Sequence, residues 1–137
     1  MADNQLPPKL QTVTPYLAIQ DAGQAIEFYK QALGAVEVFR LNGDDGRVSH
    51  AEIHIDGAAI YISDEYPDIH VYSAQRLGDS PVMIVLEVAD VDASYERAVA
   101  AGAAPDRPPQ DSFDGALRTA KVVDPYRHRW MFTRQSG

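Results

Sequence analysis

The segment VTPYLAIQDAGQAIEFYKQALGA, residues 13–35, holds a strand pattern followed at once by a helix pattern. Residues 10–20 alternate apolar and polar side chains, which predicts a strand because one face of a strand repeats every second residue. Asp21 then stands at an N-cap position and Gly34 at a C-terminal stop. The apolar residues between them recur at helical spacing and predict a helix over residues 22–33.

The residues after this helix predict three antiparallel strands, at 36–41, 48–55 and 58–63. Two turns separate them, one rich in Asp and Gly over residues 42–46 and one at Asp56 and Gly57. Asp-Gly between alternating segments is a strong short-range hairpin signal. Residues 64–80 contain acid, proline and glycine without a clean period, so we interpret them as a connection.

The same order then returns in the second half of the chain. It predicts a strand at 82–88, a cap at Asp90, a helix up to Gly102, and strands at 103–107, 117–123 and 129–134. The fold class is therefore α+β, with βαβββ modules at 9–65 and 81–135 joined by the connection 66–80. Each helix covers one face of a four-stranded sheet, so we expect a single domain over residues 1–137 whose incurved mixed sheet encloses a cleft.

Composition narrows the class of protein. The chain has 137 residues, 45% hydrophobic and 23% charged, which is typical of a globular domain. Twenty acidic residues against 12 basic ones disfavour nucleic acid as a partner, and no segment is apolar enough to predict a membrane span. The chain contains no cysteine and its N-terminus has no apolar leader, so we expect a cytoplasmic protein.

Three segments together resemble the vicinal oxygen chelate superfamily, which includes glyoxalase I, bleomycin and fosfomycin resistance proteins, and extradiol dioxygenases. They are residues 13–35 quoted above, GRVSHAEIHIDGAAIYISDE at 46–65, and DPYRHRW at 124–130. Within the superfamily the chain is most similar to the PhnB-like, glyoxalase-like group. The resemblance implies the glyoxalase/bleomycin resistance fold and often a homodimer, but no particular reaction.

The resemblance also implies where a metal would bind in metal-dependent relatives. When the motifs of this chain are aligned with those of the relatives, the four ligand positions fall on Thr14, Glu52, Met83 and Met131. Only Glu52 is a usable ligand for a divalent cation, because thioether sulfur is a poor ligand for magnesium or a first-row divalent metal. We therefore predict no metal centre and no cofactor.

An alternative metal cluster stays open. His50, Glu52 and His54 alternate along one strand, so their side chains face the same side of the sheet. Neighbours two residues apart are about 6 to 7 Å apart along the strand, which seldom lets three of them converge on one ion. A polar strip in a wet cavity, or one facing solvent, is the other interpretation.

Alternation also predicts the residues of the cleft. Ile53, Ile55, Ile60 and Ile62 are expected under the first helix, and Trp130 and Phe132 in the second core. The predicted ligand-binding residues are then Tyr16, His50, Glu52, His54, Tyr61, Met83, Phe113, Arg129 and Met131. Aromatic and methionine side chains suit flat organic ligands. Met83 and Met131 could instead fill a closed core.

Two of these residues have proposed roles. Glu52 is the candidate general base, because apolar neighbours would disfavour its ionised form. Phe113 lies in PPQDSFDG, residues 108–115, which resembles a mobile loop at the cleft mouth in the family, or is a solvated turn.

The sequence thus predicts a protein that binds a small organic molecule without a metal. The alternatives are a metal-dependent enzyme, either a glyoxalase-type lyase or isomerase or a dioxygenase, and a domain whose cleft is filled by its own side chains.

Overall fold

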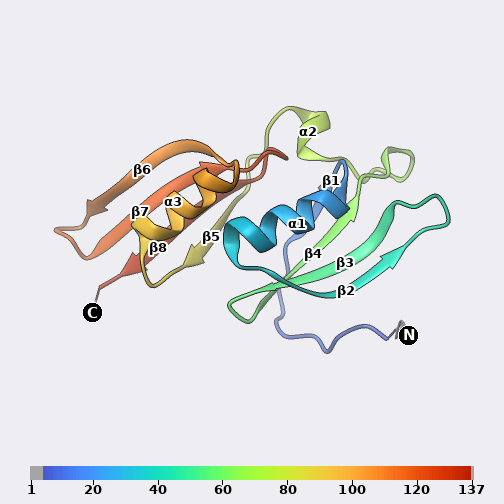
Figure 1. The fold of residues 1–137 in the computed structure, drawn as a ribbon, viewed down its shortest axis with the longest axis horizontal. Coiled ribbons are helices and arrows are strands. Elements are labelled where there is room, and N and C mark those ends of the chain that lie inside the picture. The colour runs from blue at the N-terminus through green and yellow to red at the C-terminus, as the bar shows by residue number, and fades with distance from the viewer. Residues whose placement is uncertain (1–4, 137) are drawn as a thin grey trace. The chain divides into compact units, whose positions relative to one another are not determined.

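A computed structural model describes residues 5–136, which form two compact units that divide after Arg76. Each unit has its own four-stranded mixed sheet and its own long helix (Figure 1). The α+β class and the two βαβββ modules predicted from the sequence are confirmed. No helix of the described residues is long and apolar enough to cross a membrane.

The first unit has the strand order β1-β4-β3-β2, in which β1 is parallel to β4 and the other pairs are antiparallel. Its main elements are β1 (Tyr16–Ile19), α1 (Ala22–Leu33), β2 (Val36–Asn42), β3 (Val48–Ile55) and β4 (Ala58–Asp64).

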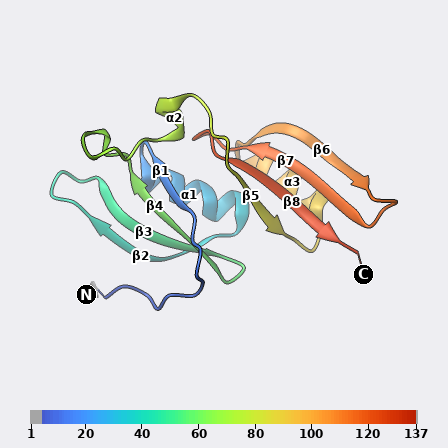
Figure 2. The ribbon, with the colours of Figure 1, turned by 180° about the vertical axis from the view of Figure 1, so that it is seen from behind.

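Helix α1 begins and ends as its sequence predicts. Asp21 accepts a hydrogen bond from the backbone N–H of Gln24, and Gly34 takes the left-handed conformation that ends many helices. The helix lies on one face of its sheet, and the view from behind shows the opposite face without a helix (Figure 2). The four predicted isoleucines are all buried.

The second unit repeats this topology with the order β5-β8-β7-β6. Its elements are β5 (Met83–Glu87), α3 (Val91–Ala101), β6 (Ala104–Ser112), β7 (Leu117–Val123) and β8 (Arg129–Gln135). Asp90 caps α3 through the N–H of Ala93. Trp130 and Phe132 are each 1% exposed and form the core with α3, as predicted.

The first strand is much shorter than the predicted 10–20. Pro15 has no backbone N–H to donate, and the strand begins only at Tyr16. Before it, the Gln11 side chain accepts from Ala59 N and donates to Ala59 O, both at 2.9 Å. A side-chain amide therefore takes the place of a backbone partner on β4.

Two other predicted segments need correction. Residues 108–112 belong to strand β6, so the predicted loop shrinks to a tight turn in which Phe113 and Asp114 have positive φ. The connection is also more regular than predicted. It contains a short 3₁₀ helix, η1 (Pro67–Ile69), a bridge between Tyr66 and Val71, and the four-residue helix α2 (Ala74–Leu77).

Candidate functional site

The uncovered face of the first sheet carries a row of side chains from all four strands. Tyr16 pairs with Tyr61, Tyr61 with Glu52, and Glu52 with Phe39. Directly paired residues point to the same face of a sheet. We call these four residues the first row, and it is mostly aromatic with one carboxylate.

His50 lies against the first row. Its ring centroid is 5.4 Å from that of Tyr16, 5.1 Å from Tyr61 and 5.9 Å from Phe39. Its Nδ1 forms a hydrogen bond of 2.7 Å with the Tyr16 hydroxyl. Burial lowers the pKa of His50 and raises the pKa of Tyr16, so both groups are neutral near pH 7. This pair suits hydrogen bonding to a neutral ligand better than proton transfer.

Glu52 is buried and already has a partner. His54 Nε2 donates to its Oε2 at 2.7 Å, and the Glu52 side chain is 4% exposed. The structure therefore brings Tyr16, His50, Tyr61, Glu52 and His54 to one face, as the sequence predicts for their strands. The catalytic role of Glu52 stays a prediction.

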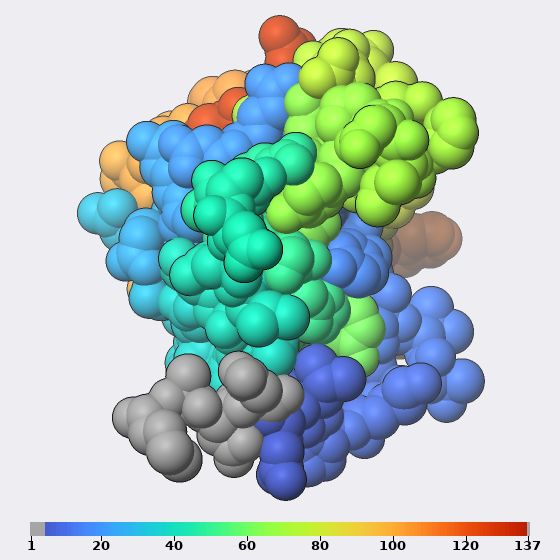
Figure 3. All heavy atoms as spheres, turned by 90° about the vertical axis from the view of Figure 1, so that its right-hand side faces the viewer, coloured from blue at the N-terminus to red at the C-terminus, as the bar shows by residue number. Residues whose placement is uncertain are grey.

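A pocket of about 850 Å³ opens beside Tyr16 at one end of the uncovered face. Its floor includes Tyr16, Ala18 and Ser63, and one wall is the β2–β3 turn at residues 43–45 with Ser49. The other wall is the connection, which contributes Tyr66 and residues 69–72. Figure 3 looks toward this end, with the turn in blue-green and the connection in yellow-green.

The sequence did not predict the wall that the connection forms. Segment 66–72 lacks periodicity, yet it brings two tyrosines and a histidine to the pocket. The His70 Nδ1 and the Tyr72 hydroxyl lie 3.0 Å apart. The density of aromatic residues in YPDIHVY was the one available signal.

The Tyr66 end of this wall is tied to the opposite wall. Tyr66 and Val71 exchange two backbone hydrogen bonds of 2.8 and 3.0 Å, which close the small loop between them. The Arg47 guanidinium lies 4.0 Å from the centroid of the Tyr66 ring and forms an ion pair with Asp45 in the β2–β3 turn. Arg47 therefore contacts both walls of the pocket.

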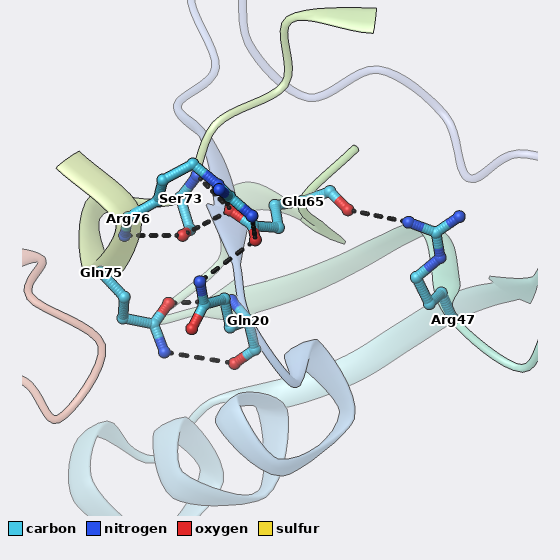
Figure 4. A network of polar contacts seen from close by, with 6 residues as sticks. All are labelled: Gln20, Arg47, Glu65, Ser73, Gln75 and Arg76. Atoms are coloured by element: carbon cyan, nitrogen blue, oxygen red, sulfur yellow. Dashed lines mark hydrogen bonds and ion pairs between the residues drawn. The ribbon is translucent and has the colours of Figure 1, made fainter. Parts of the chain in front are cut away.

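Glu65 holds the other end of the connection (Figure 4). Its carboxylate accepts from Ser73 N and Oγ, from Gln20 Nε2, and from two nitrogens of Arg76 at 3.0 and 2.7 Å. Gln75 is bonded in turn to the backbone of Gln20. The Arg76 guanidinium and the Ser73 donors lower the pKa of Glu65 to about 2, so this carboxylate is ionised across the physiological range.

The second unit places its predicted residues on its own uncovered face. Met83 and Arg129 are paired there, and Arg129 forms ion pairs with Asp79 at 3.0 Å and Asp106 at 3.5 Å. Met83 is 36% exposed, so it does not fill a core. Phe113 is in the β6–β7 turn, 76% exposed.

The counterpart of the first row differs in chemistry. Val85 pairs with Met131, Met131 with Lys121, and Lys121 with Arg107. We call these four residues the second row. Strand by strand, Val85 corresponds to Tyr16, Met131 to Tyr61, Lys121 to Glu52 and Arg107 to Phe39.

This correspondence corrects the register used for the metal ligands. Met131 lies on β8, whose counterpart is β4, so its equivalent in the first unit is Tyr61, whereas Glu52 lies on β3. With Thr14 and Met83, the ligand positions are therefore either Tyr61 and Met131 or Glu52 and Lys121, and neither set offers an imidazole or more than one carboxylate. Divalent cations prefer those donors, so the residues present do not fit the metal centre of the metal-dependent relatives.

The other candidate cluster is also unsuited to a metal. Among the described residues, no three His, Asp or Glu side chains are grouped so as to hold an ion. His50 is bonded to Tyr16, and His54 to Glu52.

With this geometry in place, comparison with known proteins identifies the family. The sequence profile of the Glyoxalase/Bleomycin resistance protein/Dioxygenase superfamily matches residues 9–132, and the chain belongs to this superfamily. Protein Mb0911c of Mycobacterium bovis is 38% identical over 121 residues, which is 86% of this chain and 79% of that protein.

Solved structures agree on the fold. The crystal structure of TioX from Micromonospora sp. ML1 matches with a TM-score of 0.69 and 26% identity, covering 93% of this chain and 98% of TioX. The Arabidopsis thaliana protein At5g48480 matches with a TM-score of 0.67 and 24% identity, covering 90% and 98%.

Proposed function

We propose that this protein binds a small, flat, uncharged organic molecule in the pocket of its first unit, without a metal ion. The observation that carries the proposal is the pocket itself, in which Tyr16, Tyr66 and Tyr72 stand around a volume of about 850 Å³. A pocket of this size is in the range that holds an organic ligand.

The chemistry of the pocket sets the class of ligand. Aromatic rings bind flat ligands by stacking and by edge-to-face contact. The neutral Tyr16–His50 pair can exchange a hydrogen bond with a carbonyl or hydroxyl group. Asp44 and Asp45 at the rim, both exposed, disfavour an anionic ligand at this end.

Reversible binding, as in the bleomycin resistance members of the superfamily, fits these residues better than catalysis. His70 in the pocket and His50 beside Tyr16 are each bonded to a tyrosine, and Glu52 is bonded to His54. In line with the family resemblance, we propose a homodimer of the PhnB-like group. The lack of cysteine supports a reducing compartment such as the cytoplasm.

A titration with Nile red, an uncharged planar dye, tests the proposal. The full chain should bind the dye saturably, and Tyr16→Leu should weaken binding about tenfold, the loss of one aromatic contact. The matched control is Tyr95→Leu, on α3 and not among the residues that line the pocket. Equal weakening by both variants, or no saturable binding, would contradict the proposal.

The alternative is a metal-dependent enzyme, which would need His50, Glu52 and His54 to exchange their present hydrogen-bond partners for an ion. Elemental analysis of protein from metal-supplemented growth distinguishes it. A stoichiometric divalent ion that Glu52→Gln removes would favour the enzyme.

A further inference from the structure

Two basic side chains lie side by side on the uncovered face of the second unit. Arg107 on β6 is directly paired with Lys121 on β7, and both are half-buried. Like charges directly opposite each other on neighbouring strands destabilise a sheet. Partial burial adds to this cost, because each charge loses part of its hydration.

Neither residue has an acidic partner among the residues that the structure describes. Arg107 donates only to Thr119, at 2.5 Å to Oγ1 and 3.5 Å to the carbonyl oxygen. By contrast, Arg40, Arg76, Arg118 and Arg129 each form an ion pair with a carboxylate. The chain has 20 acidic residues for 12 basic ones, so a lack of acids does not explain the unpaired charges.

Three acidic residues on or just before the strands of this sheet are engaged elsewhere. Asp79 and Asp106 pair with Arg129. Glu87, at the end of β5, accepts from the backbone N–H of Gln135. The positive charge of Arg107 and Lys121 is therefore left for a group from outside this unit.

The backbone is irregular on both sides of Arg107. The pairing of β6 with β7 shifts register on both sides of it, between Pro105 and Arg107 and between Arg107 and Gln110. Such bulges re-aim a side chain and are frequent next to binding sites. Thr119, under the guanidinium, fixes one edge of Arg107 and leaves its other donors open.

We propose that Arg107 and Lys121 bind the oxyanion group of a small organic ligand, a carboxylate or a phosphoryl group. The planar guanidinium binds two oxygens of such a group at once, and the ammonium adds a point charge beside it. Met131 and Val85, the other members of the second row, supply an apolar surface for the rest of the ligand. None of its residues is among those that line the pocket of the first unit.

Calorimetric titration of the full chain with inorganic phosphate, and separately with acetate, tests the site at an ionic strength held constant with sodium chloride. We expect saturable binding of at least one of the two anions at one site per chain. The double variant Arg107→Gln/Lys121→Gln should weaken it at least tenfold, whereas Lys30→Gln, with the same type of charge change, should not. Comparison of phosphate with acetate shows which oxyanion the site prefers.

Equal binding by wild type and the double variant, or no saturable binding of either anion, would overturn the proposal. If the double variant does not fold, the single variant Lys121→Gln decides, with Lys121→Arg expected to keep the binding. Both titrants are small anions and neither is a flat uncharged molecule, so failure here leaves the proposal for the first unit standing.

Discussion

The two units share one topology but present opposite chemistry on their uncovered faces. The first row is Tyr16, Tyr61, Glu52 and Phe39, and the second row is Val85, Met131, Lys121 and Arg107. On the covered faces the units are alike, since Ile62 and Phe132 occupy equivalent positions and both are buried. The helix-facing residues are constrained by packing, and the uncovered residues are free to differ.

This difference argues for a division of roles. Aromatic rings with one buried carboxylate suit a neutral flat group, whereas a pair of unpartnered bases suits an anion.

Phe132→Ala should have the largest effect. Removing a buried phenyl ring from the second core should lower the free energy of unfolding by about 3–5 kcal/mol. Val85→Ala on the uncovered face of the same sheet, where Val85 is 52% exposed, should change it by less than about 0.5 kcal/mol. Urea unfolding followed by circular dichroism measures both, and similar values would refute the assignment of the two faces.

Glu65→Gln should destabilise the first unit near pH 7 by about 1–2 kcal/mol, a value reduced for solvent screening. The pKa of Glu65 is lowered from 4.5 to about 2, so its stabilisation is complete above pH 4.5 and is lost as the pH falls toward 2. Urea denaturation at a series of pH values measures this, and the free energy of unfolding should fall less steeply with decreasing pH for the variant than for wild type. Helix α3 takes no part in the bonds of Glu65, so hydrogen exchange should increase in residues 66–77 and not in α3. If the free energy of unfolding fell equally steeply below pH 4.5 for wild type and Glu65→Gln, this role of Glu65 would be refuted.

Lys121→Glu gives the second row a carboxyl group at the position that corresponds to Glu52 in the first row. The change replaces a like-charge pair with an attractive one, so we expect stabilisation of about 0.2–1 kcal/mol in the absence of phosphate and carboxylate ions. Thermal melting in chloride buffer measures it. A loss of stability would show that Lys121 already has a carboxylate partner.

His50→Gln should have the smallest effect, a change in pH dependence. Burial lowers the pKa of His50 below 6.5, so the unfolded chain takes up a proton first as the pH falls below 6.5, and stability declines. The His50→Gln variant should lack this decline in stability below pH 6.5. The control variant His70→Gln, at an exposed histidine, should still show it. Identical slopes between pH 6.5 and 5 for wild type and His50→Gln would count against a half-buried neutral imidazole at this position.

The sequence predicts the covered faces well, because the residues that pack there must be apolar at the regular spacing of a helix or a strand. The helix at 22–33 and the strands at 48–55 and 117–123 are confirmed at both ends. The ends of β1 and β6 were wrong because they depend on Pro15, on Gln11 and on two register shifts, which leave no periodic signal.

The site was predicted only in part for the same reason. Tyr16, His50 and Tyr61 follow from strand alternation. The wall formed by Tyr66 and Tyr72 does not, since it depends on the bridge to Val71 and on the bonds of Glu65. The pairing of Arg107 with Lys121 required the register of β6, which its prolines conceal.

The Gln11 side chain has a consequence for handling the protein in solution. It satisfies the backbone N–H and C=O of Ala59, at a point where β4 extends beyond the end of β1. A chain shortened to begin at residue 12 would leave these groups open on a strand, a template for cross-chain pairing. Such a truncated protein should aggregate sooner on concentration, and the Gln11→Ala variant should reproduce this behaviour.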